Sequence, residues 1–225
     1  MPASVILLGD RDTQFITHRA VDATIALLPD DVTASWVGTD EAEAEVLASA
    51  DGLWVLPGTP YLNEAVVMEA LRRRRTEGRA TLGTCGGFQH MVVEFARNAL
   101  AIQGAGHAET DDGGDHVVDR LSCSLVGETR NVTPVAGSLL AEIVGIEPFP
   151  GFHYCNYGVS PAYQERLSRG GLRWSAFAPD AGVEALELDG HPFYLGTLFQ
   201  PQMTSLDGLL HPLVAAFAAA TRRTP

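Results

Sequence analysis

The most informative stretch of this 225-residue sequence is TLGTCGGFQ, residues 81–89. It begins as a short apolar strand and runs into a Gly-x-Cys-x-Gly segment. Apolar residues then recur at helical spacing: Phe88, Met91, Val92, Phe95 and Ala99. A strand, a tight turn with a nucleophilic side chain and a helix form a nucleophile elbow, here with Cys85 in place of serine. Gly83 and Gly87 permit the sharp turn, which holds the central residue in a strained conformation at the sheet edge.

Cys85 has the sequence surroundings that a catalytic thiol needs. A helix N-terminus behind it supplies a positive dipole end and unpaired N–H groups. We expect the N–H of Gly86 to point to where an oxyanion would form, and the turn at Gly58 to supply a second donor. The alternative is a buried structural cysteine at an ordinary strand–helix turn. The glycines on both sides of Cys85 favour the elbow.

Strand and helix patterns alternate along the first half of the chain. We expect strands at 5–8, 34–37, 53–56 and 80–82, and helices at 18–28, 40–50 and 63–75. Such alternation is typical of βαβ units. Later segments are expected to be an antiparallel strand pair over 117–133, a hairpin of 184–188 with 193–199 around Asp189-Gly190, and a last helix over 206–221. The sequence therefore predicts one α/β domain over residues 1–225, with a mainly parallel central sheet flanked by helices and a smaller antiparallel sheet.

The charge and the composition argue against several classes of function. All 15 basic residues are Arg, against 28 acidic residues, and the net charge is −13. A chain without Lys has no P-loop GK[ST] motif, no Schiff-base lysine and no lysine general base. The negative charge argues against nucleic-acid binding, and no apolar run reaches the ~18 residues of a membrane span. With no basic leader at its start and 3 Cys, we expect a cytoplasmic protein without a disulfide framework, metal or cofactor.

Residues 83–89 and their continuation over 93–98 resemble the glutaminase domain of CTP synthase, a class I glutamine amidotransferase. The resemblance extends across most of the chain. Leu56-Pro57-Gly58 is similar to the oxyanion loop of that family, 107–109 to its Ser-Thr-Glu segment, and 191–193 to the strand before its catalytic His. This resemblance implies the flavodoxin-like fold of the class I amidotransferases. It also implies that Cys85 attacks a side-chain amide, and that Gln89 and Glu109 contact the substrate.

Two segments depart from the family pattern. The His-Pro-Glu segment of the family, which supplies the catalytic base and the acid that orients it, reads Gln200-Pro201-Gln202 here. A carboxamide forms hydrogen bonds but does not take up a proton at neutral pH. The family's Arg that holds the substrate carboxylate is replaced by Asn156, next to Tyr157. We therefore expect these four polar positions to line a pocket whose carboxylate side has changed, so that free glutamine is disfavoured.

Another group would have to replace the missing base. His107 ranks first, because it lies two residues from Glu109 in the segment expected to line the pocket; the alternative is a polar lining residue. Most other histidines have plainer interpretations. His153 and His191 are expected to be structural, and His211 is expected on the surface. His90 is expected to face away from Cys85, and His18 has no special sequence context. Among the remaining cysteines, Cys123 is expected in the core, whereas a pocket role of Cys155 is left open.

Three functions are compatible with this sequence. The first is a Cys85-dependent hydrolase or transferase that acts on a C–N bond of a small amide or amino-acid-like substrate other than free glutamine. The second is a binding or regulatory module that has lost catalysis, and the third is a glutaminase subunit of a separate synthetase. The first and the third take a small-molecule substrate, and the second senses a small molecule or docks on a partner. The third also needs a synthetase or other biosynthetic partner. A homodimer is a possible assembly, and neither a nucleic acid nor a membrane is expected as a partner.

Overall fold

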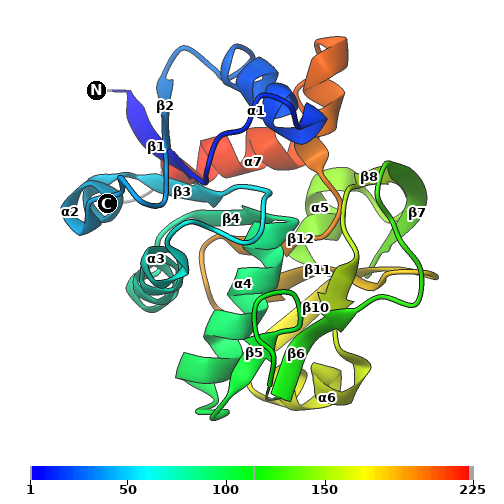
Figure 1. Cartoon of the computed structure of the whole chain (residues 1–225). Coiled ribbons are helices and arrows are strands. Elements are labelled where there is room, and N and C mark those ends of the chain that lie inside the picture. Colours follow the sequence, from blue (N-terminus) through cyan, green and yellow to red (C-terminus); the bar gives the residue numbers. More distant parts are fainter. Residues whose placement is uncertain (1, 114, 223–225) are drawn as a thin grey trace.

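The computed structural model describes residues 2–113 and 115–222, which form two sheets surrounded by helices (Figure 1). The strands are β1 (Ala3–Leu8), β2 (Val32–Val37), β3 (Gly52–Val55), β4 (Thr81–Thr84), β5 (Ala105–His107), β6 (Asp115–Arg120), β7 (Glu128–Pro134), β8 (Phe149–His153), β9 (Tyr157–Val159), β10 (Leu172–Ala178), β11 (Gly182–Leu188) and β12 (Tyr194–Thr197). The α-helices are α1 (Ile16–Ile25), α2 (Ala44–Ser49), α3 (Glu64–Glu77), α4 (Gly86–Glu94), α5 (Leu139–Val144), α6 (Pro161–Arg169) and α7 (Pro212–Thr221). A π-helix, η1 (Phe95–Ala99), and a 3₁₀-helix, η2 (Pro201–Asp207), complete the described elements.

The large sheet joins a parallel half to an antiparallel half. Its strand order is β2-β1-β3-β4-β12-β11-β10-β7-β8. Neighbouring strands from β2 to β12 are parallel, and those from β12 to β8 are antiparallel. The small sheet has the order β5-β6-β9, with one parallel and one antiparallel pair. The predicted α/β class with a large and a small sheet is confirmed, and both sheets are mixed.

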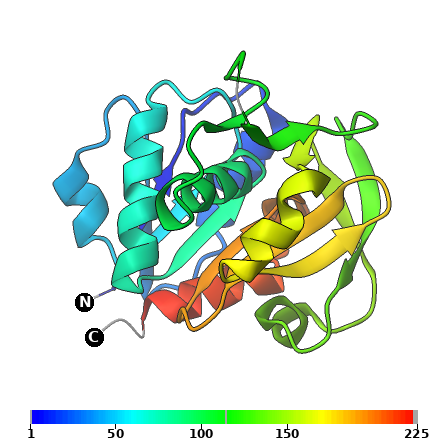
Figure 2. The same ribbon diagram turned by 90° about the horizontal axis from the view of Figure 1, so that it is seen from below.

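Apolar residues on both faces of the parallel half hold helices against it. In β1, Ile6 and Leu8 belong to one core cluster and Val5 and Leu7 to the other, because successive side chains of a strand point to opposite faces. Helices α2, α3 and α4 cover the first face, and α1 and α7 cover the second, where α5 continues the layer over β10 of the antiparallel half. Figure 2 shows α3 and α4 on the opposite side of the sheet from α7. Burial on both faces explains why these strands are continuous apolar runs in the sequence.

The structure corrects three predicted elements. The antiparallel pair expected over 117–133 does not form, because β6 belongs to the small sheet and β7 to the large one. The helix expected over 206–221 is divided: η2 ends at Asp207, and α7 begins at Pro212, whose ring suits a first helical turn. The helix after Cys85 is α-helical only to Glu94 and continues as η1.

The carboxyl ends of the parallel strands bring the candidate site residues to one edge of the large sheet. Strand β4 leads directly into Cys85, β3 into the turn at Gly58, and β12 toward Gln200. Open parallel sheets bind ligands in the crevice at this edge. The topology therefore gathers three chain segments that lie far apart in the sequence.

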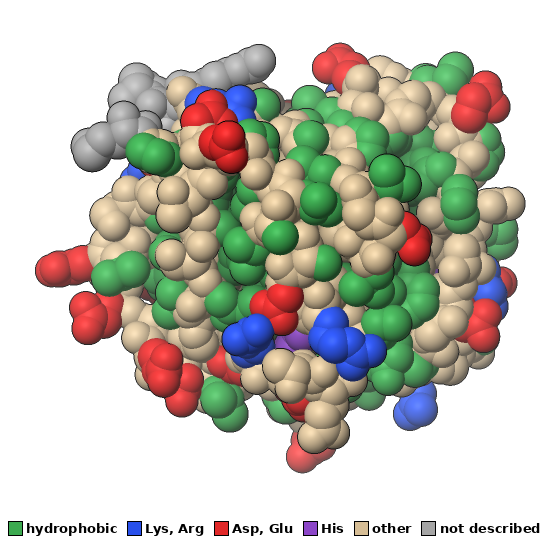
Figure 3. Space-filling model, turned by 90° about the horizontal axis from the view of Figure 1, so that it is seen from above, with side chains coloured by type: hydrophobic (Ala, Val, Ile, Leu, Met, Phe, Trp, Pro, Cys, Tyr) green, Lys and Arg blue, Asp and Glu red, His purple; other side chains and the backbone are tan. Residues whose placement is uncertain are grey.

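The surface carries charges of both signs. Figure 3 shows the face over α1 and η2, where Arg side chains lie singly or in small groups among acidic and uncharged ones. Within the described residues no single helix has the length and apolarity needed to cross a membrane, although the bent pair η2 and α7 passes on length and composition.

Candidate active site

Cys85 occupies the sharp turn between β4 and α4. Its φ and ψ are 51° and −107°, a strained backbone conformation for a residue that has a side chain. Its N–H donates to the carbonyl oxygen of Thr197 on β12 (2.8 Å), and its own carbonyl accepts from the N–H of Gln89 (3.0 Å). The strained backbone is thus held from both sides, and the residue is only 7% exposed.

Helix α4 starts so close to the sheet that residue 87 has to be glycine. A Cβ atom on Gly87 would lie 2.2 Å from the carbonyl oxygen of Val55 in β3. A side chain at this position would therefore force the N-terminus of α4 away from the sheet and from Cys85. The strand–turn–helix geometry is that of an elbow, and the catalytic role of Cys85 stays a prediction.

The turn after β3 packs against the first residue of α4. Gly58 has a φ of 119°, which a residue with a side chain rarely adopts. A Cβ on Gly86 would lie 3.2 Å from the carbonyl oxygen of Gly58 and 2.8 Å from Cγ2 of Thr59. No side chain of the described residues caps α4 at its N-terminus, so its first N–H groups remain available to a ligand. Gly58 and Gly86 are therefore neighbours beside Cys85, and their role as oxyanion donors stays a prediction.

A cavity of about 290 Å³ opens beside the Cys85 thiol. It brings together most of the predicted site residues: Gly58, Cys85, Gln89, Glu109, Asn156, Tyr157 and Gln200. The remaining three sit behind this lining, Gly86 next to Cys85, His107 against Gln89, and Gln202 against Gln200. Three lining residues that the sequence did not single out for the site are Asp10, Phe15 and His18.

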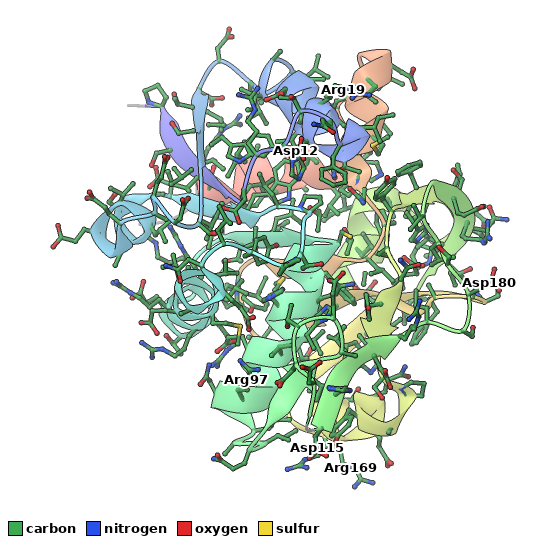
Figure 4. The ribbon with its side chains drawn as sticks, viewed as in Figure 1. Asp12, Arg19, Arg97, Asp115, Arg169 and Asp180 are labelled. Atoms are coloured by element: carbon green, nitrogen blue, oxygen red, sulfur yellow. The ribbon has the colours of Figure 1, made fainter. Side chains whose placement is uncertain are left out.

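The cavity is acidic. Among its described lining residues, the carboxylates are Asp10 and Glu109, and none is Arg. Asp10 accepts from the Oγ1 of Thr39 (2.8 Å) and from the N–H of Leu62 (2.7 Å), and the hydroxyl of Thr59 donates to Glu109. Arg97 lies at the far end of the α4–η1 helix (Figure 4). The site therefore favours a cationic or neutral ligand over an anionic one.

Gln200 and Gln202 form a buried amide pair. The Nε2 of Gln202 donates to the Oε1 of Gln200 (2.8 Å), and the N–H of Gln200 donates to the carbonyl oxygen of Phe152 (2.8 Å). The Nε2 of Gln200 and the Oε1 of Gln202 have no partner among the described residues. Gln200 lines the cavity, but its unpaired Nε2 is itself buried, and neither amide of the pair can take a proton from the thiol.

His107 is held in a chain of hydrogen bonds behind the cavity. Its Nδ1 accepts from the N–H of Glu109 (3.1 Å), so the proton is on Nε2, which donates to the Oε1 of Gln89 (3.1 Å). The Nε2 of Gln89 donates in turn to the carbonyl oxygen of Tyr157 (2.8 Å). Burial lowers the pKa of His107 to about 3, with a smaller effect of His90. This geometry favours a role in orienting Gln89, and the predicted role of His107 as a base stays a prediction without support here.

His18 ties helix α1 to the oxyanion turn. Its Nδ1 accepts from the N–H of Asp12 (2.9 Å), so its Nε2 donates to the carbonyl oxygen of Pro57 (2.8 Å). It is buried and lines the cavity, although no motif in the sequence pointed to it. The available signal was topological: residues 9–18 and 57–60 follow β1 and β3, whose carboxyl ends meet at one sheet edge.

Three other expectations can be compared with the structure. Cys123 is exposed, so the expectation of a core position is wrong; it lies in a turn after β6 rather than inside a strand. His211 is half-buried rather than on the surface, because its Nδ1 accepts from the N–H of Leu213 at the start of α7 (3.1 Å). His153 forms a buried pair with Glu184 (2.8 Å), which fits its structural interpretation.

Within the described residues no cluster of three or more His, Cys, Asp or Glu could hold a metal ion.

Known proteins with similar sequences are CTP synthases. The chain is 35% identical over 204 residues to the CTP synthase of Rubrobacter xylanophilus and 36% identical over 195 residues to that of Natronomonas pharaonis. These alignments cover 84% and 81% of this chain but 37% and 35% of the relatives, so the chain spans little more than a third of their length. No protein-family model matches the chain.

Solved structures with the same architecture include the glutaminase domain of Trypanosoma brucei CTPS with bound acivicin. That structure superposes with a TM-score of 0.84 at 24% identity, over 99% of this chain and 95% of the other. A glutamine amidotransferase from Thermotoga maritima superposes with a TM-score of 0.59 at 8% identity, over 99% and 94% of the two chains. At such identities the likeness establishes the fold.

Proposed function

We propose, from the premise that this chain has the class I glutamine amidotransferase fold and is homologous to the glutaminase domain of CTP synthase, that it is a Cys85-dependent enzyme. The substrate is a small amide or amino-acid-like molecule other than free glutamine, and the reaction breaks its C–N bond. The observation that carries the proposal is the strained Cys85, which borders an acidic cavity beside an uncapped helix N-terminus. A cysteine with a purely structural role does not require a strained backbone conformation.

The proposed chemistry is acyl transfer through a thioester. The Cys85 sulfur attacks the amide carbonyl carbon, the C–N bond breaks, and the thiol proton leaves on the departing amine. Water then adds to the thioester, which releases the acid and restores the thiol; an acceptor amine in place of water gives transfer. The N–H groups of Gly58 and Gly86 would stabilise the oxyanion of each step.

The acidic lining supports a substrate that lacks a free carboxylate. Glu109 and Asp10 suit a substrate amine, and Asn156, which also lines the cavity, replaces the family's Arg according to the sequence resemblance. An amide side chain cannot make the charged bidentate contact that Arg gives to a carboxylate. A substrate with a neutral group at this end would therefore bind better than glutamine.

The experiment compares L-glutamine with L-glutaminamide, in which a carboxamide replaces the α-carboxylate. We expect glutaminamide to acylate Cys85 and release ammonia about ten-fold faster or more, with an acyl adduct visible in the intact protein mass. Asn156→Arg should shift this preference toward glutamine, and Cys85→Ala should abolish both reactions. Identical behaviour of wild type and Cys85→Ala with every amide tried would rule out the enzyme.

A second candidate, a binding module without turnover, is favoured by the Gln200–Gln202 pair. It predicts that a small amide raises the melting temperature of wild type and of Cys85→Ala equally, with no acyl adduct at any pH. Supply of ammonia to a separate synthetase is a third proposal, which rests on the homology alone. It requires glutaminase activity near neutral pH and a synthetase partner.

A further inference from the structure

Cys155 lies in the wall of the same cavity as Cys85. It belongs to the loop between β8 and β9, and it is buried to the same extent as Cys85, with 7% exposed. Its carbonyl oxygen accepts from the N–H of Leu125 (3.0 Å), which fixes the loop against the chain after β6. The proposed acyl transfer gives this second thiol no role.

The loop that carries Cys155 crosses directly over the elbow. The Cys85 thiol donates to the carbonyl oxygen of Tyr154 (3.8 Å), the residue before Cys155. Both cysteines belong to one core cluster. A hydrogen bond with the Cys85 side chain, together with burial, raises the pKa of the Cys155 thiol well above its usual value. Cys155 therefore holds its proton more firmly than an exposed thiol does.

We propose that Cys85 and Cys155 form a redox-active dithiol that closes to an intramolecular disulfide when the protein meets a hydroperoxide. This disulfide would occupy the Cys85 sulfur and so block the acyl transfer proposed above. That consequence rests on the proposed function, but the formation of the disulfide does not. The two thiols come from segments far apart in the sequence and face one cavity that a small oxidant can enter. Backbone hydrogen bonds hold both segments, the turn of Cys85 at Thr197 and Gln89 and the loop of Cys155 at Leu125, so both cysteines keep their places beside the cavity.

The chemistry balances in two steps. The Cys85 sulfur attacks one oxygen of the hydroperoxide, the O–O bond breaks, and the alcohol leaves with the thiol proton while Cys85 becomes a sulfenic acid. The Cys155 sulfur then attacks the Cys85 sulfur, the S–O bond breaks, and the hydroxide leaves as water with the Cys155 proton. Two thiols are oxidised by two electrons, and one hydroperoxide is reduced to an alcohol and water. A small dithiol reduces the disulfide again by thiol–disulfide exchange.

Mass spectrometry tests the proposal on the full chain treated with stoichiometric hydrogen peroxide. We expect the intact protein to lose two hydrogen atoms, and a digest without reductant to give one linked peptide pair that contains Cys85 and Cys155. Dithiothreitol should restore the original mass. Cys123→Ser is the matched control and should form the same bond, because Cys123 is exposed and lies outside the cavity.

The variant Cys155→Ser separates the dithiol from ordinary oxidation of an accessible thiol. Without its partner, Cys85 should proceed to sulfinic acid several-fold faster than in wild type, since nothing resolves the sulfenic acid. Equal oxidation of Cys85 in both proteins, or a disulfide that involves Cys123, would overturn the proposal. The peptide map of the wild-type protein does not depend on whether a variant folds. It also detects the disulfide whether or not the protein hydrolyses an amide.

Discussion

At the scale of single residues, the chemistry of the site depends on the pair Gln200 and Gln202. Each amide is buried, and the pair is joined by one hydrogen bond and contains no titratable group. The Nε2 of Gln200 is buried and has no partner among the described residues. The pair therefore offers Cys85 no base, and the Cys85 thiol itself donates to the carbonyl oxygen of Tyr154.

Placing His at position 200 and Glu at position 202, the residues that the family resemblance implies there, should raise the reactivity of Cys85. In Gln200→His with Gln202→Glu, an imidazole can take the thiol proton and form an ion pair with the thiolate. We expect alkylation of Cys85 by iodoacetamide near neutral pH to become about ten-fold faster or more, measured by peptide mass spectrometry. Gln202→Glu alone is the control and should change the rate little. An unchanged rate in the double variant would mean that residue 200 does not face the sulfur.

At the scale of elements, packing gives the Arg72–Arg75 run of α3 several roles. A run of Arg residues at a helix end is usually exposed to solvent. Arg72 and Arg73 reach the solvent in this way, and each forms an ion pair with a Glu residue on the same helix. Arg74 instead is buried and donates to the carbonyl oxygens of Leu47 and Ala50 at the end of α2, and burial lowers its pKa to about 10. Arg75 pairs with the buried Glu94 of α4 (2.8 Å).

The contact between α4 and β3 should tolerate no side chain at residue 87. In Gly87→Ala the new Cβ would meet the carbonyl oxygen of Val55, which belongs to the backbone and cannot swing away. We expect a loss of about 3 kcal/mol in the free energy of unfolding, measured by urea denaturation. Gly113→Ala is the matched control, because a Cβ there meets nothing within 4 Å. Equal stability of the two variants would contradict the observed approach of α4 to the sheet.

At the scale of the whole molecule, the two sheets meet around buried polar connections. His107 at the end of β5 bonds to Gln89 in α4, and Gln89 bonds to Tyr157 at the start of β9. His153 and Glu184 join β8 to β11 within the large sheet. The two bonds of Gln89 hold the small sheet against α4 just after the elbow, so the stability of the molecule and the shape of the cavity are linked.

Acidification should weaken the fold through His107. Its pKa in the folded chain is lowered to about 3, mainly by burial, whereas an exposed His of the unfolded chain titrates near ~6.5. The unfolded state therefore binds more protons between these values, and stability is lost as the pH falls below ~6.5. We expect this residue to cost about 1–2 kcal/mol between about pH 7 and pH 5.

Urea unfolding of wild type and His107→Gln at both pH values measures this effect. The variant should be less stable than wild type at about pH 7, because Gln89 loses a fixed donor, but it should lose less further stability on acidification. An equal acid-induced loss in both proteins would mean that other groups account for it.

Local patterns alone were sufficient for the α/β class, the parallel strands and the elbow at Cys85, because periodicity and turn chemistry depend on neighbours along the chain. The family resemblance, which also depends on the sequence only, singled out Gln200, Gln202 and most of the residues that line the cavity. The local patterns misplaced Cys123 and paired 117–133 wrongly, since alternation indicates a strand but not its partner. Only the fold brought His18 to Pro57 and the Cys155 loop over Cys85, contacts that span 39 and 69 residues. Such contacts depend on which strand ends meet at one sheet edge, and no local pattern carries that information.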